Sequence, residues 1–414
     1  MTRLNVYLAE EHVGVLDRDG GGELRFTYLP GATPISLSLP YREEPFEEGE
    51  CYPFFEGVLP EEQQRKAIER STHVSASDVF SLLDLLGGEV AGAVRILREG
   101  EDPASPPQGA PPGPLQDNSL GELLETLPRR PMLAGEGELR LSLAGAQTKL
   151  PVCLTDGRVR LPAPGEPTTH IIKPAIPGYP AITENEAFMM RLAAEVGLPV
   201  AHVEARRLVA EKGPRTYLLV ARYDREVRDG RVVRLHQEDF CQALGISSIY
   251  KYEANLGPGL SRCRRVLFDH SMKPAADART FLDAVLFNLL VGNGDAHAKN
   301  FSLLHTAHGV RLAPLYDLLS TLYYPSLAPV MAMAIAGKFR FSEVDRLALE
   351  EGAKAIGLAR TYLTKRLDRL RDLLPAAAAS VAADLSGKGL DDAVLERLEQ
   401  LVMDRIGRLA PELG

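Results

Sequence analysis

The stretch from Val291 to Asn300, together with a carboxylate a short way downstream, places the strongest constraint on this chain. Within Val-Gly-Asn-Gly-Asp-Ala-His-Ala-Lys-Asn, Asp295 is followed five positions later by Asn300, and a second isolated carboxylate, Asp317, follows Tyr316. This layout is typical of a phosphoryl-transfer site, in which one carboxylate accepts the proton of the attacking hydroxyl. An amide and a second carboxylate then bind magnesium ions, which offset the roughly four negative charges of ATP.

The residues around this stretch fit a loop held between a helix and a hairpin. Apolar residues at helical spacing predict a buried helix upstream, namely Leu282, Val285, Leu286, Leu289 and Leu290. Gly292 and Gly294 end it. Residues 301–304 and 310–313 predict a hairpin that would bring Asp317 back beside Asn300. A glycine turn after a core helix, with Asp and Asn as turn formers, explains the same residues, so this stretch alone leaves both interpretations open.

Composition places the chain among globular proteins of two or three domains. It has 414 residues, of which 45% are hydrophobic and 25% charged, and its net charge of −9 argues against autonomous nucleic-acid binding. Its four cysteines lie far apart and form no Cys-x-x-Cys or Cys/His cluster, so neither a zinc site nor a disulfide framework is indicated. The start lacks a signal-peptide apolar core, and no run approaches the ~20 apolar residues of a membrane span. A cytoplasmic protein without membrane contact is therefore expected.

The first part of the chain divides into a small unit and a linker. Residues 1–100 predict an α+β unit in which nothing looks catalytic, so a scaffold or partner-docking role is expected. Residues 101–118 contain six prolines and two glycines, which exclude a helix or a central strand and predict a linker.

A second informative stretch runs from Leu139 to Leu150. Leu139, Leu141 and Leu143 alternate as in a strand, small residues interrupt it at 144–146, and 151–154 fit a returning strand. Such a loop can lay backbone N–H groups over phosphates, with Lys149 as a point charge. An ordinary hairpin turn is the alternative interpretation.

A short apolar strand from Thr168 to Pro174 carries a single lysine, Lys173. The helix predicted after it starts with a capping-box pattern, Thr183-Glu-Asn-Glu186. A strand lysine followed by a helical glutamate has the order found in a kinase small lobe, where the lysine reaches the α- and β-phosphates and the glutamate orients it. An edge-strand lysine and a plain capping role for Glu186 are the alternatives.

The rest of the chain predicts two more strands and then helices. Strands are expected at 205–209 and 216–220, and Ala221-Arg-Tyr-Asp-Arg225 follows in the position of a nucleotide-binding hinge. Residues 237–244 are expected to form the beginning of a helix, and the chain is helical from about Ser342. Two apolar stripes mark the last helices: Leu363, Leu367, Leu370 and Leu374, then Val394, Leu398, Leu401 and Leu409, with Asp391 as the cap of the second helix.

These motifs jointly resemble the HipA family, the serine/threonine-kinase toxins of bacterial type II toxin–antitoxin pairs. The chain carries, in the family's order, Leu141-Ser-Leu-Ala-Gly-Ala-Gln-Thr-Lys149, Thr169-His-Ile-Ile-Lys173, Asn185-Glu186, Arg222-Tyr-Asp-Arg225, Gln237-Glu-Asp239 and Gly294-Asp-Ala-His-Ala-Lys-Asn300, then Tyr316-Asp317. The first hundred residues also resemble the family's N-terminal subdomain through residues 35–40, 53–55 and 59–61.

The resemblance implies an α+β fold of the two-lobed protein-kinase-like type with an N-terminal α+β accessory subdomain and an all-α C-terminal part. The expected divisions are the N-terminal subdomain at 1–100, the linker at 101–118, the small lobe at 119–225 and the helical large lobe at 226–414.

The resemblance also implies roles for individual residues. Asp295 is the expected catalytic base, and Asn300 and Asp317 are the expected magnesium ligands. The expected ATP-binding residues are Ala144, Gly145, Ala146, Gln147, Thr148 and Lys149 in a phosphate loop, Lys173, the hinge residues Ala221, Arg222 and Tyr223, and His297, Ala298, Lys299, Asn300, Tyr316 and Asp317. Ser142 matches the serine that family members autophosphorylate, which expels the loop and inactivates the kinase. Ala221 departs from the family, whose hinge usually begins with Glu, but a backbone contact would lose little.

The sequence therefore predicts an ATP- and magnesium-dependent kinase that phosphorylates a protein serine or threonine and so arrests growth. The resemblance implies a substrate of the aminoacyl-tRNA synthetase class and a HipB-like helix-turn-helix antitoxin as partner, with DNA contacted only through that antitoxin. A small-molecule kinase on the same scaffold is one alternative, and a non-enzymatic co-repressor is another. The joint presence of Asp295, Asn300 and Asp317 argues against the co-repressor, because a pure binder does not need all three.

Overall fold

The computed structural model describes residues 3–103, 110–135, 139–211 and 213–413. Its N-terminal unit is an antiparallel four-stranded sheet of order β3–β2–β1–β4, with helix α1 packed on β3 and helix α3 on β4. The elements are β1 (Leu4–Leu8), β2 (Glu11–Arg18), β3 (Leu24–Tyr28), α1 (Glu48–Gly57), α2 (Glu62–Thr72), α3 (Val79–Leu86) and β4 (Val94–Arg98). Asp78 caps α3 by accepting the Ser81 N–H at 3.1 Å.

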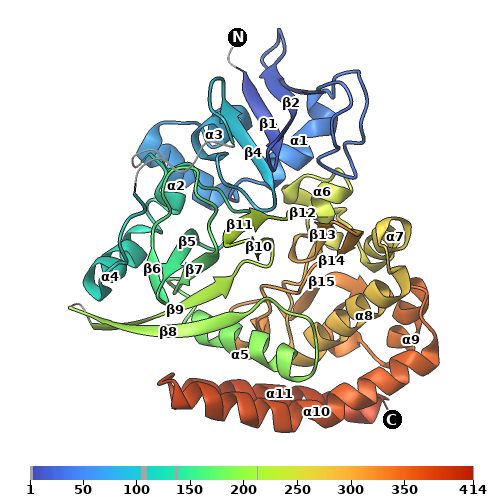
Figure 1. Ribbon diagram of the computed structural model, residues 1–414. Coiled ribbons are helices and arrows are strands. Elements are labelled where there is room, and N and C mark those ends of the chain that lie inside the picture. Colours follow the sequence, from blue (N-terminus) through green and yellow to red (C-terminus); the bar gives the residue numbers. More distant parts are fainter. Residues whose placement is uncertain (1–2, 104–109, 136–138, 212, 414) are drawn as a thin grey trace.

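The second unit is an antiparallel five-stranded sheet of order β6–β5–β7–β9–β8. Helix α4 packs on β8, and helix α5 packs on β8 and β9 (Figure 1). The elements are α4 (Asp117–Thr126), β5 (Leu150–Thr155), β6 (Arg158–Arg160), β7 (His170–Pro174), α5 (Ile182–Glu195), β8 (Val203–Ala210) and β9 (Gly213–Ala221). The strands expected around Lys173 and at 205–209 and 216–220 are thus confirmed.

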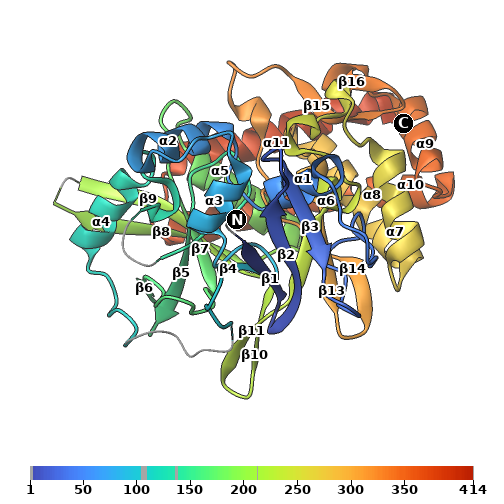
Figure 2. The same ribbon diagram turned by 90° about the horizontal axis from the view of Figure 1, so that it is seen from above.

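The remaining chain is mainly helical, with three small antiparallel sheets. The helices are α6 (Phe240–Ala243), α7 (Leu260–His270), α8 (Pro274–Val291), α9 (Arg346–Ala355), α10 (Arg360–Gly387) and α11 (Asp392–Leu413). The sheets are β10 (Arg225–Arg228) with β11 (Arg231–Arg234); β12 (His236–Asp239), β13 (Ser302–Thr306) and β14 (Gly309–Leu312); and β15 (Val330–Ile335) with β16 (Lys338–Arg340). Figure 1 shows α10 and α11 side by side beneath α5 and α8, and Figure 2 shows the β10–β11 ribbon projecting from the edge of the molecule.

Several of these elements confirm the sequence-based expectations. The hairpin expected after residue 300 is β13–β14, and the apolar stripe of α10 is buried from Leu363 to Leu374. Asp391 accepts the N–H groups of Ala393 and Val394 at the start of α11, as expected of a cap. The overall architecture is α+β with two lobes, as predicted, and it ends in helices α9 to α11.

The buried apolar side chains form two clusters, and one of them crosses between units. The first cluster joins α5, α7, α8, α10 and α11. The second contains Val6 and Phe26 of the N-terminal sheet together with Leu150 and Ile172 of the five-stranded sheet. Because burial stabilises by about 25 cal/mol per Å² of apolar surface, a shared core fixes the N-terminal unit on the small lobe. The boundaries expected at residues 100 and 118 stay predictions.

Three expectations about local structure are wrong. Residues 139–143 form no strand, since Leu141 makes a single bridge to Glu89, and the neighbours of β5 are β6 and β7. Helix α5 starts at Ile182 after Ala181 in the left-handed region, with φ of 57°, so the capping box at 183–186 does not form. The helix expected within 237–244 is only the short α6, because the residues before it pair with β13 as strand β12.

Two further observations concern the described residues. None of their helices is long and apolar enough to cross a membrane. Cys51, Cys153, Cys241 and Cys263 are all buried free thiols.

Candidate active site

One cavity of about 650 Å³ brings most of the expected site residues together. This volume lies within the range of small-molecule sites, about 300–1,000 Å³. The expected residues that line it are Ala144, Gly145, Ala146, Gln147, Lys149, Lys173, Ala221, Arg222, Tyr223, Asp295, His297, Lys299, Asn300, Tyr316 and Asp317. Ser142, Thr148 and Ala298 do not line it.

The loop after α8 ties Asp295 to Asn300. Helix α8 ends at Gly292, whose φ of 72° is in the left-handed region, so the chain turns sharply out of the helix. The Asn300 side-chain amide then donates to the backbone oxygen of Asp295 at 2.8 Å. Because this bond closes the loop, the spacing of five residues places both side chains at the same end of the cavity.

The Asp295 carboxylate is open to the cavity and held by a tyrosine. Its side chain is 45% exposed. Its Oδ1 accepts a hydrogen bond from the Tyr252 hydroxyl at 2.6 Å. Partial desolvation inside the cavity raises the pKa of Asp295 to about 6, although the bond from Tyr252 opposes this shift. The second carboxylate oxygen is left for an incoming proton donor, which is the geometry that a general base needs.

Lys173 joins two carboxylates from distant parts of the chain. Its Nζ lies 2.6 Å from Glu186 Oε1 and 2.6 Å from Asp317 Oδ1. Burial disfavours each charge, but the two carboxylates outweigh it and raise the pKa of Lys173 above its ordinary value. Burial likewise opposes ionisation of Asp317, and the nearby Lys173 and Lys149 still keep its pKa well below the usual range. The site therefore holds a lysine cation beside an ionised Asp317.

The donor set at this end of the cavity suits a magnesium ion. Asp317 has φ of 59°, an uncommon value for a residue with a side chain, and its carboxylate is 27% exposed. Asn300, which also lines the cavity, carries an amide oxygen. The described residues contain no group of three or more His, Cys, Asp and Glu that could hold a metal by themselves. Two protein oxygens completed by phosphates and water are what Mg²⁺ commonly takes in nucleotide sites.

The hinge segment enters the cavity through its backbone. Arg222 is buried and its guanidinium binds Asp224 Oδ2 at 2.7 Å and Glu89 Oε1 at 3.3 Å, so this side chain is already satisfied by protein partners. Tyr223 stacks on Tyr316 with ring centroids 5.8 Å apart. The N–H groups of Ala221 and Arg222 donate to the oxygens of His202 and Thr169. The Tyr223 N–H, which has no acceptor among the described residues, and an aromatic wall are left for a nucleotide base.

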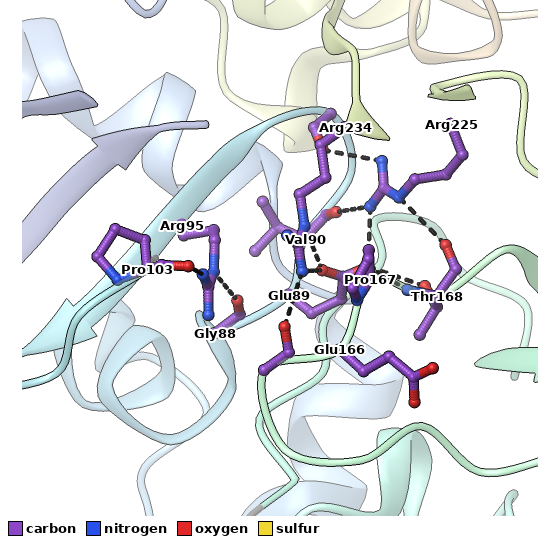
Figure 3. Close-up of polar contacts among 12 residues, drawn as sticks. Gly88, Glu89, Val90, Arg95, Pro103, Glu166, Pro167, Thr168, Arg225 and Arg234 are labelled. Carbon is purple, nitrogen blue, oxygen red and sulfur yellow. Dashed lines mark hydrogen bonds and ion pairs between the residues drawn. The ribbon is translucent and has the colours of Figure 1, made fainter. Parts of the chain in front are cut away.

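The Glu89 carboxylate fixes this hinge from the N-terminal unit. Its Oε1 lies 2.8 Å from Arg225 Nη2, and its Oε2 lies 2.7 Å from Arg234 Nη2 (Figure 3). The backbone N–H and the hydroxyl of Thr168 donate to Oε1 at 3.0 and 2.9 Å. Burial opposes the charge, but the arginines outweigh it and depress the pKa of Glu89 far below its ordinary value. The hinge is thus positioned by a residue about 130 positions earlier in the chain.

The expected phosphate loop is a loop rather than the turn of a hairpin. Gly145 has φ of 114°, in the left-handed region, so the position favours glycine. Lys149 Nζ donates to the Ala144 oxygen at 2.8 Å. Within the described part of the chain, the N–H groups of Ala146 and Thr148 donate to no protein acceptor. Free N–H groups beside a lysine suit an anion such as a phosphate.

Two residues of the catalytic loop are engaged by protein partners. Lys299 Nζ lies 3.1 Å from Asp239 Oδ2, and its backbone oxygen accepts the Tyr316 hydroxyl at 2.6 Å. His297 is buried, which lowers its pKa and keeps it neutral. Both residues line the cavity, but neither presents an unengaged charge to it.

Local sequence patterns did not indicate a site role for Tyr252, Lys251, Glu61 or Gln64. Tyr252 binds Asp295, and the adjacent Lys251 places its Nζ 2.7 Å from both carboxylate oxygens of Glu61. Gln64 binds the phosphate loop. Their partners lie tens to nearly two hundred positions away in the chain, so no local spacing could indicate them.

We expect Lys149 to make nucleotide binding dependent on pH. Burial, and then the charge of Lys173, lower the pKa of Lys149 to about 8, against the carboxylates of Asp317, Glu186 and Glu61. Because the ammonium form binds phosphates, affinity for a non-hydrolysable ATP analogue should fall above pH 8 and be about tenfold weaker per pH unit. Calorimetry at pH 7, 8 and 9 measures this. Lys149→Met should bind more weakly at pH 7 and vary little with pH, and a flat wild-type profile would contradict the assignment.

Comparison with known proteins identifies relatives over nearly the whole chain. Residues 4–97 match the family model described as HipA N-terminal domain, and residues 141–378 match the HipA-like C-terminal domain. "Putative kinase Y4mE" of Sinorhizobium fredii is 45% identical over 411 residues, 97% of each chain. The serine/threonine-protein kinase toxin HipA of Shewanella oneidensis is 33% identical over 354 residues, 82% of this chain and 79% of that protein.

A solved structure has the same fold. It is the complex of HipA, HipB and operator DNA from the Shewanella oneidensis toxin–antitoxin system, and the likeness has a TM-score of 0.86 at 29% identity. The likeness covers 99% of this chain and 98% of the matched chain. The N-terminal unit, the five-stranded sheet and the helical part therefore recur together.

Proposed function

The chain belongs to the HipA family, and from that premise we propose that it is an ATP-dependent serine/threonine-protein kinase and the toxin of a toxin–antitoxin pair. The observation that carries the proposal is the ion-paired set Lys173–Glu186–Asp317 in one cavity with Asp295 and Asn300. A co-repressor would not need a buried lysine held between two carboxylates at 2.6 Å beside a carboxylate with a raised pKa.

The proposed reaction uses this chain's residues in the following way. Asp295 accepts the proton of a serine or threonine hydroxyl while the hydroxyl oxygen forms a bond to the γ-phosphorus of ATP. The bond from that phosphorus to the bridging oxygen of ADP breaks, and ADP carries away the electron pair. Lys173 and Lys149 offset the phosphate charge, and the 221–223 backbone holds the adenine. Asn300 and Asp317 would hold magnesium, which neutralises charge on the phosphate oxygens when bound.

The partner proposal rests on the Shewanella structure, whose HipA chain is similar to this one over almost its whole length. We propose a HipB-like helix-turn-helix antitoxin, with DNA reached only through that protein, in keeping with this chain's net charge of −9. The proposed protein substrate is of the aminoacyl-tRNA synthetase class, and we place the reaction in the cytoplasm. Phosphorylation of this substrate would arrest cell growth.

Labelled ATP separates this proposal from a small-molecule kinase. Purified protein is incubated with γ-labelled ATP, magnesium and cell lysate, and the expected result is a labelled protein other than the chain itself. Label found in small metabolites alone supports the alternative. No label in either fraction, with ATP unbound by calorimetry, would overturn the proposed function.

Ser142 is proposed as the site of autophosphorylation, and it is fully buried in this structure. Its hydroxyl donates to the Val58 oxygen at 2.8 Å. A phosphate would add about two negative charges and three acceptor oxygens where there is no room for them, so the loop must leave the cavity. Mass spectrometry after incubation with magnesium-ATP should find phosphate on Ser142 in the wild type and none in Asp295→Asn. Unmodified Ser142 in a protein that is active on its substrate would contradict this assignment.

A further inference from the structure

The phosphate loop is held almost entirely by the N-terminal unit. The Ser142 N–H donates to the Glu89 oxygen at 2.8 Å, and the Glu61 N–H donates to the Gly145 oxygen at 3.2 Å. The Gln64 amide donates to the oxygens of Gly145 at 3.0 Å and Gln147 at 2.8 Å. Together with the Ser142–Val58 bond, these contacts join a loop of the small lobe to α1, α2 and the residues that precede β4.

Among the described residues, the side chain of Gln64 forms hydrogen bonds with this loop only. It lies on the buried face of α2 and is 4% exposed. Its nitrogen uses both hydrogens on the loop, while its Oε1 is buried without a protein partner among the described residues. Burying an amide costs free energy unless it is hydrogen-bonded, so an apolar residue would suit a purely structural position better.

The two bonds also set the direction of the free N–H groups. In a trans peptide the C=O and N–H groups point in opposite directions. The oxygens of Gly145 and Gln147 face Gln64, so the N–H groups of Ala146 and Thr148 face away from α2. Neither N–H donates to a protein acceptor among the described residues, and of the two residues Ala146 lines the cavity.

We infer that Gln64 is a positioning residue that holds the loop with its free N–H groups ready for the phosphates of the nucleotide. The N-terminal unit therefore takes part in nucleotide binding, although its residues were expected to serve as a scaffold or a docking surface. This inference rests on the proposed function for the identity of the ligand, but the contacts of the loop can be tested without it.

The first experiment measures the loop directly. Gln64→Met keeps an unbranched side chain of similar length and removes both donors, and Lys66→Met on the exposed side of α2 is the matched control. Hydrogen exchange of residues 142–149 in the nucleotide-free protein should be about tenfold faster in Gln64→Met, from the loss of two hydrogen bonds, and unchanged in the control. Gln64→Glu, which presents an acceptor to two carbonyl oxygens, should give a larger effect. Unchanged loop exchange in both Gln64 variants would overturn the inference.

The second experiment compares two ligands in the same proteins. A non-hydrolysable ATP analogue with magnesium should bind Gln64→Met about tenfold more weakly, while adenosine, which has no phosphates, should bind as in the wild type. In kinetics, KM for ATP should rise while kcat changes less than twofold. Equal weakening of both ligands, or of neither, would count against a positioning role. If the wild type binds neither ligand, the proposed function fails, and loop exchange still decides whether Gln64 holds the loop.

Discussion

Asp295→Asn is expected to lower phosphoryl transfer by roughly 10²-fold or more, the loss typical of a positioned general base. The amide has nearly the same shape as the carboxylate but cannot take the proton of the attacking hydroxyl. The bond from Asn300 is made to the backbone oxygen of residue 295, so it survives the substitution. The side chain is 45% exposed, so the fold should be retained. Transfer is measured with labelled ATP and the lysate protein identified as substrate.

Asp269→Asn is the matched control, because Asp269 lies on the exposed side of α7. Its transfer rate should equal that of the wild type. Circular dichroism and calorimetric ATP affinity show whether Asp295→Asn keeps its fold and its nucleotide site. A folded, ATP-binding Asp295→Asn protein with near-wild-type transfer would remove Asp295 from its proposed role as the base.

Glu89→Ala is expected to destabilise the protein by about 3–5 kcal/mol, the cost typical of removing one partner from a buried ion pair. The Glu89 side chain is 5% exposed, and it faces Arg222 and Arg225, which are 1% and 3% exposed, and Arg234. Without the carboxylate, Asp224 alone remains to compensate Arg222 and Arg225. The free energy of unfolding is measured by urea denaturation at pH 7.

Glu226→Ala is the matched control, because its partner Arg228 is 50% exposed and such surface pairs contribute about 0–1 kcal/mol. The pH gives a second test. Folding depresses the pKa of Glu89, so its contribution is complete above the ordinary carboxyl pKa of about 4.3 and is lost as the pH falls below it. The difference between Glu89→Ala and the wild type should therefore stay constant from pH 6 to 8. If Glu89→Ala lowers the free energy of unfolding by less than about 1 kcal/mol at pH 7, the ion pairs of Glu89 with Arg222, Arg225 and Arg234 do not contribute substantially to stability.

Local patterns in the sequence predicted much of the reaction centre. The apolar spacing before Gly292 predicted α8, and the two short strands after Asn300 predicted the β13–β14 hairpin. The helix and the hairpin form through contacts between residues only a few positions apart. The spacing of apolar residues along the chain therefore indicates them directly. The order of a strand lysine and a helical glutamate suggested that Glu186 orients Lys173, and these side chains meet at 2.6 Å. The contact of Lys173 with Asp317, also at 2.6 Å, was not predicted.

Local patterns failed where a distant contact decided the conformation. Residues 183–186 match the capping-box sequence pattern, but helix α5 starts earlier, at Ile182. The Glu186 side chain forms an ion pair with the buried Lys173 instead. Residues 139–143 alternate like a strand, but the N-terminal unit takes up the hydrogen bonds of this segment and of the loop after it.

The sequence by itself determined the order of the motifs, the helix and hairpin around the catalytic loop, and the residue types that this chemistry needs. The tertiary structure alone showed that the N-terminal unit contacts the hinge and the loop that line the candidate site. Glu61, Gln64 and Glu89 approach the hinge, Lys251 and the phosphate loop from about 50 to 190 positions away in the chain. Hydrogen bonds and buried charges act through space, and spacing along the chain does not record which distant residues will meet.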